Sequence, residues 1–354
     1  MSTSLIRSAG PCARRLVRLA AARGGLAAAV VTLAGFAVPC WADADLEAVV
    51  VTAQRRAENV QDVPIAISAF TANDLERTNI RQAGDITTLV PNLLLSSPYG
   101  EEAEPVFSLR GVTSNDFSQN QSAPVAMYVD EVYRSVGALQ ALQTFDLERV
   151  EVLRGPQGTL YGKNSTGGAI SFFTRNPDLN AYNGYATAGF GKFSQYTVEG
   201  AVGGPIKDGE LGWRAAVYYN KRDGWLKSVV PGIEPANSID ALGGRLTFLA
   251  KPNDNFTAQL KLNVTRSRGT PYGVRPMNND PNVTGGNPPT DFYRNAAISM
   301  VHKVIDSEGA SLKMDWKVAD HAVLTSVSGF DYGRWVMVGD DASVADELSD
   351  PPPP

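Results

Sequence analysis

The sequence contains very little cysteine and histidine. Its 354 residues include two cysteines, Cys12 and Cys40, and two histidines, His302 and His321. This inventory excludes disulfide frameworks, iron–sulfur clusters, cysteine nucleophiles and zinc sites built from several histidines. We therefore expect a protein with no cofactor and no structural metal of its own.

Basic residues, long apolar runs and long helices are scarce as well. The chain has 32 lysines and arginines against 37 aspartates and glutamates, a formal net charge of −5, and a net-acidic chain is a poor binder of nucleic acid. The apolar run at residues 24–38 is shorter than the roughly 20 residues that a membrane-spanning helix needs. No stretch keeps a helical periodicity long enough for a helical bundle.

The first 42 residues have the composition of a signal peptide. A basic stretch without acidic residues precedes the apolar run, and small residues at Ala42 and Ala44 provide cleavage sites. We expect cleavage after one of these two residues; an uncleaved anchor is the alternative, which the short apolar run disfavours. Removal of residues 1–42 would leave 27 basic and 37 acidic residues, a formal charge of −10, and no cysteine. The mature protein is therefore expected outside the cytoplasm.

The region up to about residue 180 mixes short strands with short helices. Strands are expected at residues 65–70, 125–132 and 149–153, a helix at residues 71–78, and a helical turn at residues 85–90. Thr71 can cap the helix because Asp74 follows three residues later, an acidic variant of the capping box. The pattern predicts a compact α+β domain.

From residue 181 onward the sequence changes to longer strands with strict alternation. Seven strands are expected, at residues 184–191, 196–204, 211–220, 242–250, 256–265, 311–318 and 324–332. In the three clearest of them one face is apolar, and the other carries charge that includes Arg214, Lys261 and Lys313.

The connections between these strands alternate between short turns and long loops. Strands of about ten residues with this alternation are typical of a transmembrane β-barrel. A soluble β-sandwich is the alternative, although its strands more often have five or six residues.

A glycine-rich loop follows the strand at residues 149–153. Its glycines are Gly155, Gly158, Gly162, Gly167 and Gly168, where the backbone can adopt positive φ or approach another segment closely. A phosphate-binding loop is excluded, because Gln157 stands where a glycine is required and Lys163 is followed by Asn164 rather than by Ser or Thr. The loop is therefore structural or used for docking.

The stretch from Asp146 to Ile170 resembles the plug signature of TonB-dependent outer-membrane receptors. Other features follow in the order that this family shows, at Gln54–Ser68, Pro91–Leu93, Ser108–Val112 and Tyr128–Tyr133. The resemblance covers about residues 46–177. It implies an α+β plug domain at residues 54–180, followed at residues 181–354 by the first part, about seven strands, of an antiparallel transmembrane β-barrel.

The segment after the leader resembles the TonB box, the element through which such receptors are energised. Its residues are Leu46, Glu47, Ala48, Val49, Val50, Val51 and Thr52. An extended β-branched segment without proline or glycine can pair as an edge strand with a periplasmic partner. Its position next to the leader favours a free arm at residues 43–53; the alternative is a buried plug strand at residues 49–51.

Charged residues of the plug could pair with the barrel wall. The candidate plug-signature and docking residues are Arg110, Gly111, Glu148, Arg149, Glu151, Arg154, Gly155, Gly158, Gly162, Gly167 and Gly168. The resemblance implies a role between plug and barrel for Glu151 and Arg154. A desolvated pair there would hold the plug and yield under force.

The resemblance implies energised uptake rather than catalysis. In such receptors an extracellular ligand binds, and TonB with its inner-membrane energising complex pulls on the plug. We expect a monomer in the outer membrane of a Gram-negative bacterium that imports a ferric siderophore; vitamin B12, haem and oligosaccharides are alternative ligands. A passive porin would not account for a plug or a coupling arm. An exported glycoside hydrolase needs two convergent acids, whereas Glu101-Glu102 and Asp340-Asp341 are merely adjacent.

We also expect the chain to be an N-terminal fragment of a longer receptor. Plugged barrels of this kind have about 22 strands, and an open sheet of seven would leave unpaired backbone groups in lipid. The sequence ends in Asp350 and four prolines, which cannot donate to a strand ladder.

Overall fold

The fold is described by a computed structural model. It describes residues 49–52, 54–56, 58–78, 80, 83–97, 105–114, 122–135, 144–228, 232, 234–270, 294–295 and 302–338. The chain divides into two units, residues 1–47 and 48–354, and all of these residues belong to the second. The expected signal peptide and Leu46, Glu47 and Ala48 lie outside the described residues.

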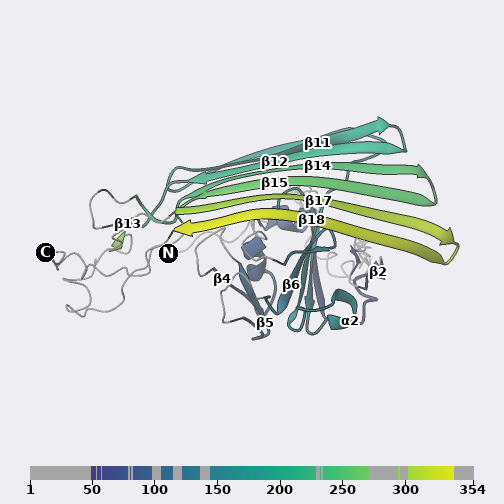
Figure 1. The fold of residues 1–354 in the computed structure, drawn as a ribbon, viewed down its shortest axis with the longest axis horizontal. Coiled ribbons are helices and arrows are strands. Elements are labelled where there is room, and N and C mark those ends of the chain that lie inside the picture. Colours follow the sequence, from purple (N-terminus) through teal and green to yellow (C-terminus); the bar gives the residue numbers. More distant parts are fainter. Residues whose placement is uncertain are drawn as a thin grey trace, which may run out of the picture. The chain divides into compact units, whose positions relative to one another are not determined.

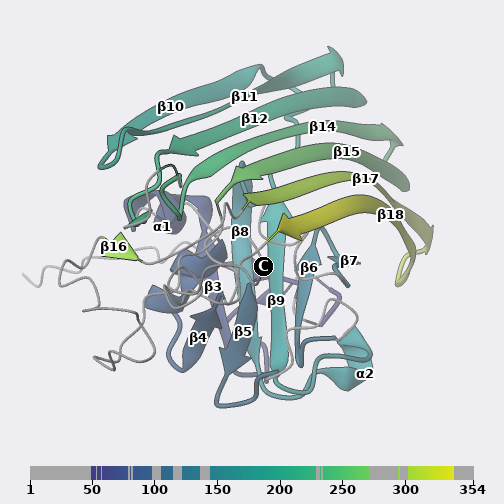
Figure 2. The ribbon, with the colours of Figure 1, turned by 60° about the vertical axis from the view of Figure 1, so that its left-hand side comes forward.

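The plug region, taken as the described residues between 49 and 180, is built on a five-stranded mixed sheet. Its elements are β1 (Val50–Val51), β2 (Glu58–Asn59), β3 (Ile67–Thr71), α1 (Ala72–Arg77), the 3₁₀ helix η2 (Ala83–Thr88), β4 (Leu93–Ser96), β5 (Val106–Leu109), β6 (Val125–Val129), β7 (Val132–Tyr133), β8 (Leu147–Arg154), α2 (Gly158–Tyr161) and β9 (Gly168–Thr174). The strand order is β3-β8-β9-β6-β7, in which only β6 and β9 pair in parallel (Figure 2). Two small antiparallel pairs, β1–β2 and β4–β5, accompany it.

Both faces of the five-stranded sheet are buried at its centre, which explains why β6 and β9 are almost wholly apolar. Phe172 of β9 and Met127 of β6 point into one core with Leu75, Ile86 and Leu93 from the covering elements. The alternate side chains point into a second core. Its members include Val51 of β1, Tyr128 of β6, Leu153 of β8, Tyr161 of α2 and Ala169 of β9. The β1–β2 pair and α2 therefore cover the face opposite to α1 and η2.

The local predictions for the plug region hold, with one correction. Thr71 caps α1, and its hydroxyl and the carboxylate of Asp74 form the expected capping box. The helical turn near residue 85 is η2. The single strand expected at residues 125–132 is wrong, because the chain turns back at Asp130 and Glu131 to form the β6–β7 hairpin. Asp-Glu is not a usual turn pair, so the sequence does not signal this bend.

The second region forms one antiparallel sheet of seven long strands. Its elements are β10 (Asn183–Gly191), β11 (Gln195–Lys207), β12 (Leu211–Arg222), β13 (Lys227–Ser228), β14 (Ile239–Asn253), β15 (Phe256–Gly269), β16 (Arg294–Asn295), β17 (His302–Ala319) and β18 (Ala322–Val338). The strand order β10-β11-β12-β14-β15-β17-β18 follows the chain (Figures 1 and 2). Only the two-residue strands β13 and β16 pair outside this sheet. All seven predicted strands are present, and several extend beyond their predicted ends.

The seven-stranded sheet places apolar side chains outward and polar ones inward. On β15, Leu262 and Val264 are 40% and 54% exposed, whereas Lys261 is 3% exposed. Arg214 on β12, buried to the same degree, shows that the pattern extends across the sheet. This arrangement is the reverse of that in a water-soluble protein and is typical of strands that face lipid on one side.

No helix among the described residues is long and apolar enough to cross a membrane.

Candidate functional site

The described part of the TonB-box-like segment is paired and packed. Val50 and Val51 form β1 opposite Asn59 and Glu58 of β2. The side chain of Val51 is fully buried in the second core, whereas Val50 is 51% exposed. Burying a valine side chain contributes roughly 1.5–3 kcal/mol. Residues 49–51 therefore do not form the expected free arm, because Val51 has an apolar site to fill.

Thr52 is held by a charged network on β8. Its backbone N–H donates to Glu151 Oε1 at 2.9 Å, and its hydroxyl donates to the same oxygen at 3.3 Å. Arg149 Nε donates to that oxygen at 2.8 Å, while Arg149 Nη2 reaches the Thr52 hydroxyl. Glu151 is fully buried, and hydrogen bonds to a charged group typically contribute about 1.5–3 kcal/mol each. The predicted residues Thr52, Arg149 and Glu151 thus meet in one cluster.

Arg55 extends the cluster toward the aromatic residues of the second core. Its guanidinium lies 4.7 Å from the ring centre of Tyr161 and 5.5 Å from that of Tyr128. Burial, together with the negative charge of Glu151, raises the pKa of Tyr161 to about 12. Tyr161 therefore stays neutral at physiological pH and presents its ring to the cation.

Arg154 and Glu148 form their described hydrogen bonds and ion pairs within the plug region. Arg154 donates from its backbone to Ala66 and from Nη2 to the carbonyl of Ile67. Glu148 forms an exposed ion pair with Arg149. Arg110 is exposed and is followed by Gly111 at φ +81°. A barrel contact for Glu151 or Arg154 remains a prediction.

The glycine-rich loop connects β8 to β9 through α2. Gly155 and Gly162 have positive φ, and Gly158 begins α2. At Gly168, with φ +149°, an added Cβ would lie 2.3 Å from the carbonyl oxygen of Leu153, so only glycine allows β9 to approach β8 there. Gly167 packs next to Val112 and Val125. These glycines therefore support the packing of the plug region, and a docking role for the loop stays a prediction.

The plug region is docked on the seven-stranded sheet through two turns, and the first lies at residues 144–146. The carboxylate of Asp146 accepts two hydrogen bonds of 2.7 Å from Arg214 on β12. Its backbone N–H donates to Glu199 on β11, and the carbonyl of Phe145 accepts from Arg245 on β14. Asp146 and Arg214 are almost fully buried, so the pair is desolvated.

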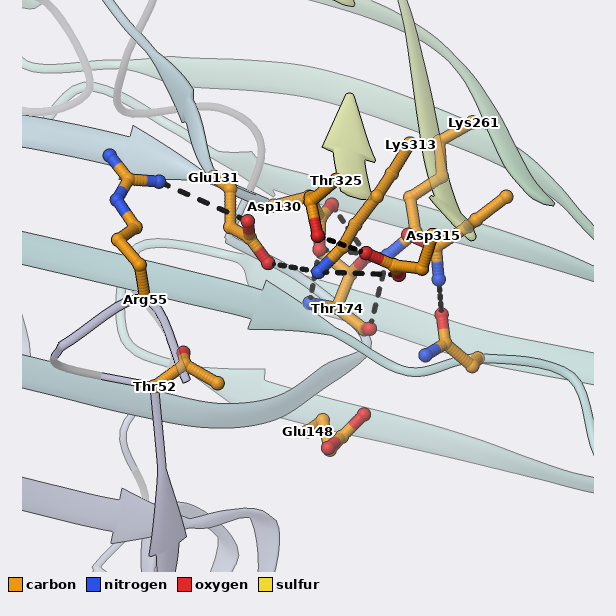
Figure 3. A network of polar contacts seen from close by, with 12 residues as sticks. Thr52, Arg55, Asp130, Glu131, Glu148, Thr174, Lys261, Lys313, Asp315 and Thr325 are labelled. Atoms are coloured by element: carbon orange, nitrogen blue, oxygen red, sulfur yellow. Dashed lines mark hydrogen bonds and ion pairs between the residues drawn. The ribbon is translucent and has the colours of Figure 1, made fainter. Parts of the chain in front are cut away.

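The second docking turn, at residues 130–134, reaches the next three strands. Asp130 pairs with Lys261 on β15 at 2.7 Å, and Glu131 pairs with Lys313 on β17 at 2.5 Å. Arg134 pairs with Asp331 on β18. Figure 3 shows Asp130 and Glu131 side by side, with Lys261 and Lys313 directed toward them. Six strands in chain order are thus contacted by two short turns of the plug region.

The carboxylate of Asp130 is bonded to both the sheet and the plug region. Burial raises its pKa, but the charges of Lys261 and Arg245, with hydrogen bonds from Lys261 and the Thr174 N–H, outweigh this and hold the pKa below its ordinary value. The Thr174 hydroxyl donates to the other carboxylate oxygen. Asp130 is therefore an anion at neutral pH and holds Lys261 in place.

One cavity of about 450 Å³ lies between α1 and the first strands of the sheet. Asp146, Arg175, Tyr185 and Glu199 contribute polar groups to its lining. Each of these groups already has a partner: Arg175 pairs with Glu76, and Tyr185 donates to Glu199. Among the described residues no group of three potential metal ligands comes together.

The candidate residues predicted from the sequence do not include the docking residues Asp130, Glu131 and Asp146. Their partners Arg214, Lys261 and Lys313 are present in the sequence as cations on the polar faces of predicted strands. That signal could have led to Asp130 and Glu131 only if the β6–β7 bend had been recognised.

A family model confirms the nature of the first region. Residues 59–169 match the TonB-dependent receptor plug domain. The chain is 32% identical over 219 residues to the pesticin receptor of Yersinia pestis, covering 60% of this chain and 31% of that protein. It spans about a third or less of the length of these curated relatives.

Solved structures share the fold. The ferric yersiniabactin uptake receptor from Yersinia pestis aligns with a TM-score of 0.66 at 23% identity, over 77% of this chain and 41% of that one. The outer-membrane ferripyoverdine receptor of Pseudomonas aeruginosa, bound to ferripyoverdine, gives a TM-score of 0.63 at 16% identity, over 79% and 35%.

A plug domain is thus followed in this chain by an antiparallel sheet of seven long strands, the arrangement that the solved receptors share. Within the described residues the sheet of seven strands does not close. Residues 59–169 thus match a TonB-dependent receptor plug domain, and the relatives that the chain is similar to are receptors, among them pesticin and ferripyoverdine receptors.

Proposed function

We propose that the whole protein is a TonB-dependent outer-membrane receptor that imports a ferric siderophore and is a transporter rather than an enzyme. The docking of the plug on the polar face of an outwardly apolar sheet carries this proposal. A plug that is held by a few ion pairs can be displaced to open a path for a ligand. The names of the relatives support a siderophore as that ligand.

The proposed division of the chain follows from the same reasoning. Residues 1–42 are a signal peptide, residues 43–53 a coupling arm, residues 54–180 the plug, and residues 181–354 the first part of the barrel. The change from the five-stranded to the seven-stranded sheet between β9 and β10 supports the last boundary.

In the proposed mechanism the segment Leu46–Thr52 pairs with TonB as an added strand. TonB, driven by its inner-membrane complex, then pulls on β1, and the plug yields along its ion pairs with the wall. Val50 supports this assignment because half of its side chain is exposed while its backbone is already extended. Strand addition depends on backbone hydrogen bonds and tolerates many side chains.

The experiment compares two substitutions at one position. Val50→Pro removes a backbone donor and Val50→Ala keeps it. In cells that depend on a ferric siderophore as their iron source, we expect Val50→Pro, like deletion of residues 46–52, to abolish uptake while ligand binding to cells persists. Val50→Ala and the exposed-turn variant Asp254→Ala should retain uptake. Undiminished uptake after the deletion would contradict energised transport and favour passive diffusion.

A further inference from the structure

The three plug carboxylates that pair with cations of the sheet share an unusual backbone. Asp130, Glu131 and Asp146 have φ values of +51°, +68° and +52°. Residues other than glycine rarely adopt this left-handed conformation. A two-residue hairpin loop with positive φ at both positions is best made by Asn-Gly, whereas the β6–β7 loop has Asp-Glu. The presence of two acids at this loop indicates that their charges are needed there.

Glu131 differs from the other two acids because its carboxylate forms two ion pairs, one with the plug region and one with the sheet. Oε1 accepts from Lys313 Nζ of the wall strand β17 at 2.5 Å, and Oε2 lies 3.9 Å from Arg55 Nη1 (Figure 3). The Glu131 side chain is 16% exposed, so the two ion pairs are only partly screened by water. Arg55 follows Thr52 by three residues in the chain. One side chain therefore connects the TonB-box-like segment to the barrel wall.

Lys313, at the sheet end of this connection, is itself held in place by neighbouring residues. Lys313 lies 3.9 Å from Asp315 on the same strand, and Asp315 accepts from the hydroxyl of Thr325 on β18. Arg55 stacks on Tyr128 and Tyr161, so its guanidinium is oriented before it meets Glu131. Both partners of Glu131 are thus positioned by other residues, and the carboxylate joins them.

We propose that Glu131 is a positioning residue that clasps the β1–β2 pair to wall strand β17 and keeps the TonB-box-like segment docked. The proposal rests on the proposed function, since it assigns a restraint to the segment through which the receptor is energised. A pull on Thr52 reaches the wall through Arg55, Glu131 and Lys313. Release of the segment and loosening of the plug from β17 are therefore linked.

The test measures the mobility of a nitroxide label at position 50 in the whole protein in outer-membrane vesicles. The label is attached after Val50→Cys; Cys12 and Cys40 leave with the proposed signal peptide, and any cysteine beyond residue 354 is replaced by serine. Val50 is half exposed and lies outside the core, so the label itself should not release β1. No ligand and no TonB are present.

Glu131→Asn is the main variant, because asparagine tolerates the left-handed turn and lacks the charge. We expect the mobile fraction of the label to rise about fivefold, as removal of a partly exposed ion pair predicts. Lys313→Gln should change it in the same direction. Glu131→Lys combined with Lys313→Glu restores the wall pair but places a cation opposite Arg55, so the label should stay mobile.

Two controls separate the clasp from general loosening of the plug. Glu76→Gln on α1 removes the exposed ion pair between Glu76 and Arg175 and should leave the label at position 50 immobile. A label introduced by Leu94→Cys on β4, where Leu94 is 66% exposed, should keep its native spectrum in every variant.

Three outcomes would overturn the clasp. They are a native spectrum at position 50 in Glu131→Asn or in Lys313→Gln, recovery of the native spectrum in the charge-swapped protein, and increased mobility at positions 50 and 94 together. Because the label is read without ligand or TonB, the clasp can fail while uptake still depends on residues 46–52. Conversely, uptake can prove independent of those residues while the clasp is present.

Discussion

The two sheets of this protein are stabilised in opposite ways. The five-stranded plug sheet buries apolar side chains on both faces, as in β9, where every residue is buried. The seven-stranded sheet exposes its apolar face and buries lysine and arginine on the other. The plug therefore has a hydrophobic core of its own, whereas its attachment to the wall combines buried ion pairs with the packing of one plug side chain, Phe145, against Ala201 and Ala216. Such a plug can leave the wall while it remains folded.

The largest expected effect tests the plug core. Phe172→Ala, at a fully buried position, should lower the free energy of unfolding of the plug by about 3–5 kcal/mol because it removes apolar contacts and leaves a cavity. Phe330→Ala, at a position on β18 that is 66% exposed, should leave plug unfolding unchanged. Urea unfolding followed by the proteolytic sensitivity of the plug measures both. If both substitutions lowered the free energy of unfolding of the plug equally, the plug would not have a hydrophobic core separate from the seven-stranded sheet.

The next effect tests the attachment. Arg214→Met leaves the carboxylate of Asp146 buried without its bidentate partner, and loss of one member of a buried pair costs about 3 kcal/mol or more. We expect the plug to separate from the sheet at lower urea than its own core unfolds, as measured by cross-linking between the two. Lys207→Met, in an exposed pair with Glu210, is the matched control and should have no such effect. If the plug separated from the sheet only at the urea concentration at which its core unfolds, the contrast between the plug core and its attachment would be wrong.

The smallest effect concerns pH. The pKa of Asp130 in the folded protein lies below its value of about 3.9 in the unfolded chain. A depressed pKa contributes stability that is fully present above about pH 4 and is lost as the pH falls through the folded value. Cross-linking between plug and sheet should therefore be constant near neutral pH and decrease below about pH 4. Asp130→Asn should flatten that decrease, and an unchanged profile would mean that another acid controls docking.

Local structure could be predicted well from the sequence. The alternation around Leu260 and Leu262 is enough to place β15, and Thr71 with Asp74 is enough to begin α1. These features depend on residues that are close in the chain. The family's plug signature also lies within one continuous stretch.

The docking contacts could not be predicted in this way. Lys261 is recognisable as an inward cation, but its partner is Asp130, which the sequence places within an apparently continuous strand. The position of β1 could not be predicted either. An extended Val49–Val51 segment suits either a free arm or a strand that packs against Leu153. Tertiary packing decided the matter by providing an apolar site for Val51.

The strand orders of the two sheets have a consequence for folding. In the seven-stranded sheet, each strand pairs with the strand of that sheet that follows it in the chain. Paired residues are therefore close in sequence, except where a long connection separates β12 from β14 and β15 from β17. In the plug, by contrast, Ile67 pairs with the distant Leu153, and β6 can join the sheet only by pairing with β9, which comes later in the chain. Chains with distant contacts close larger loops and fold more slowly. We therefore expect successive hairpins to form early, and the plug to reach its final topology as the slower event.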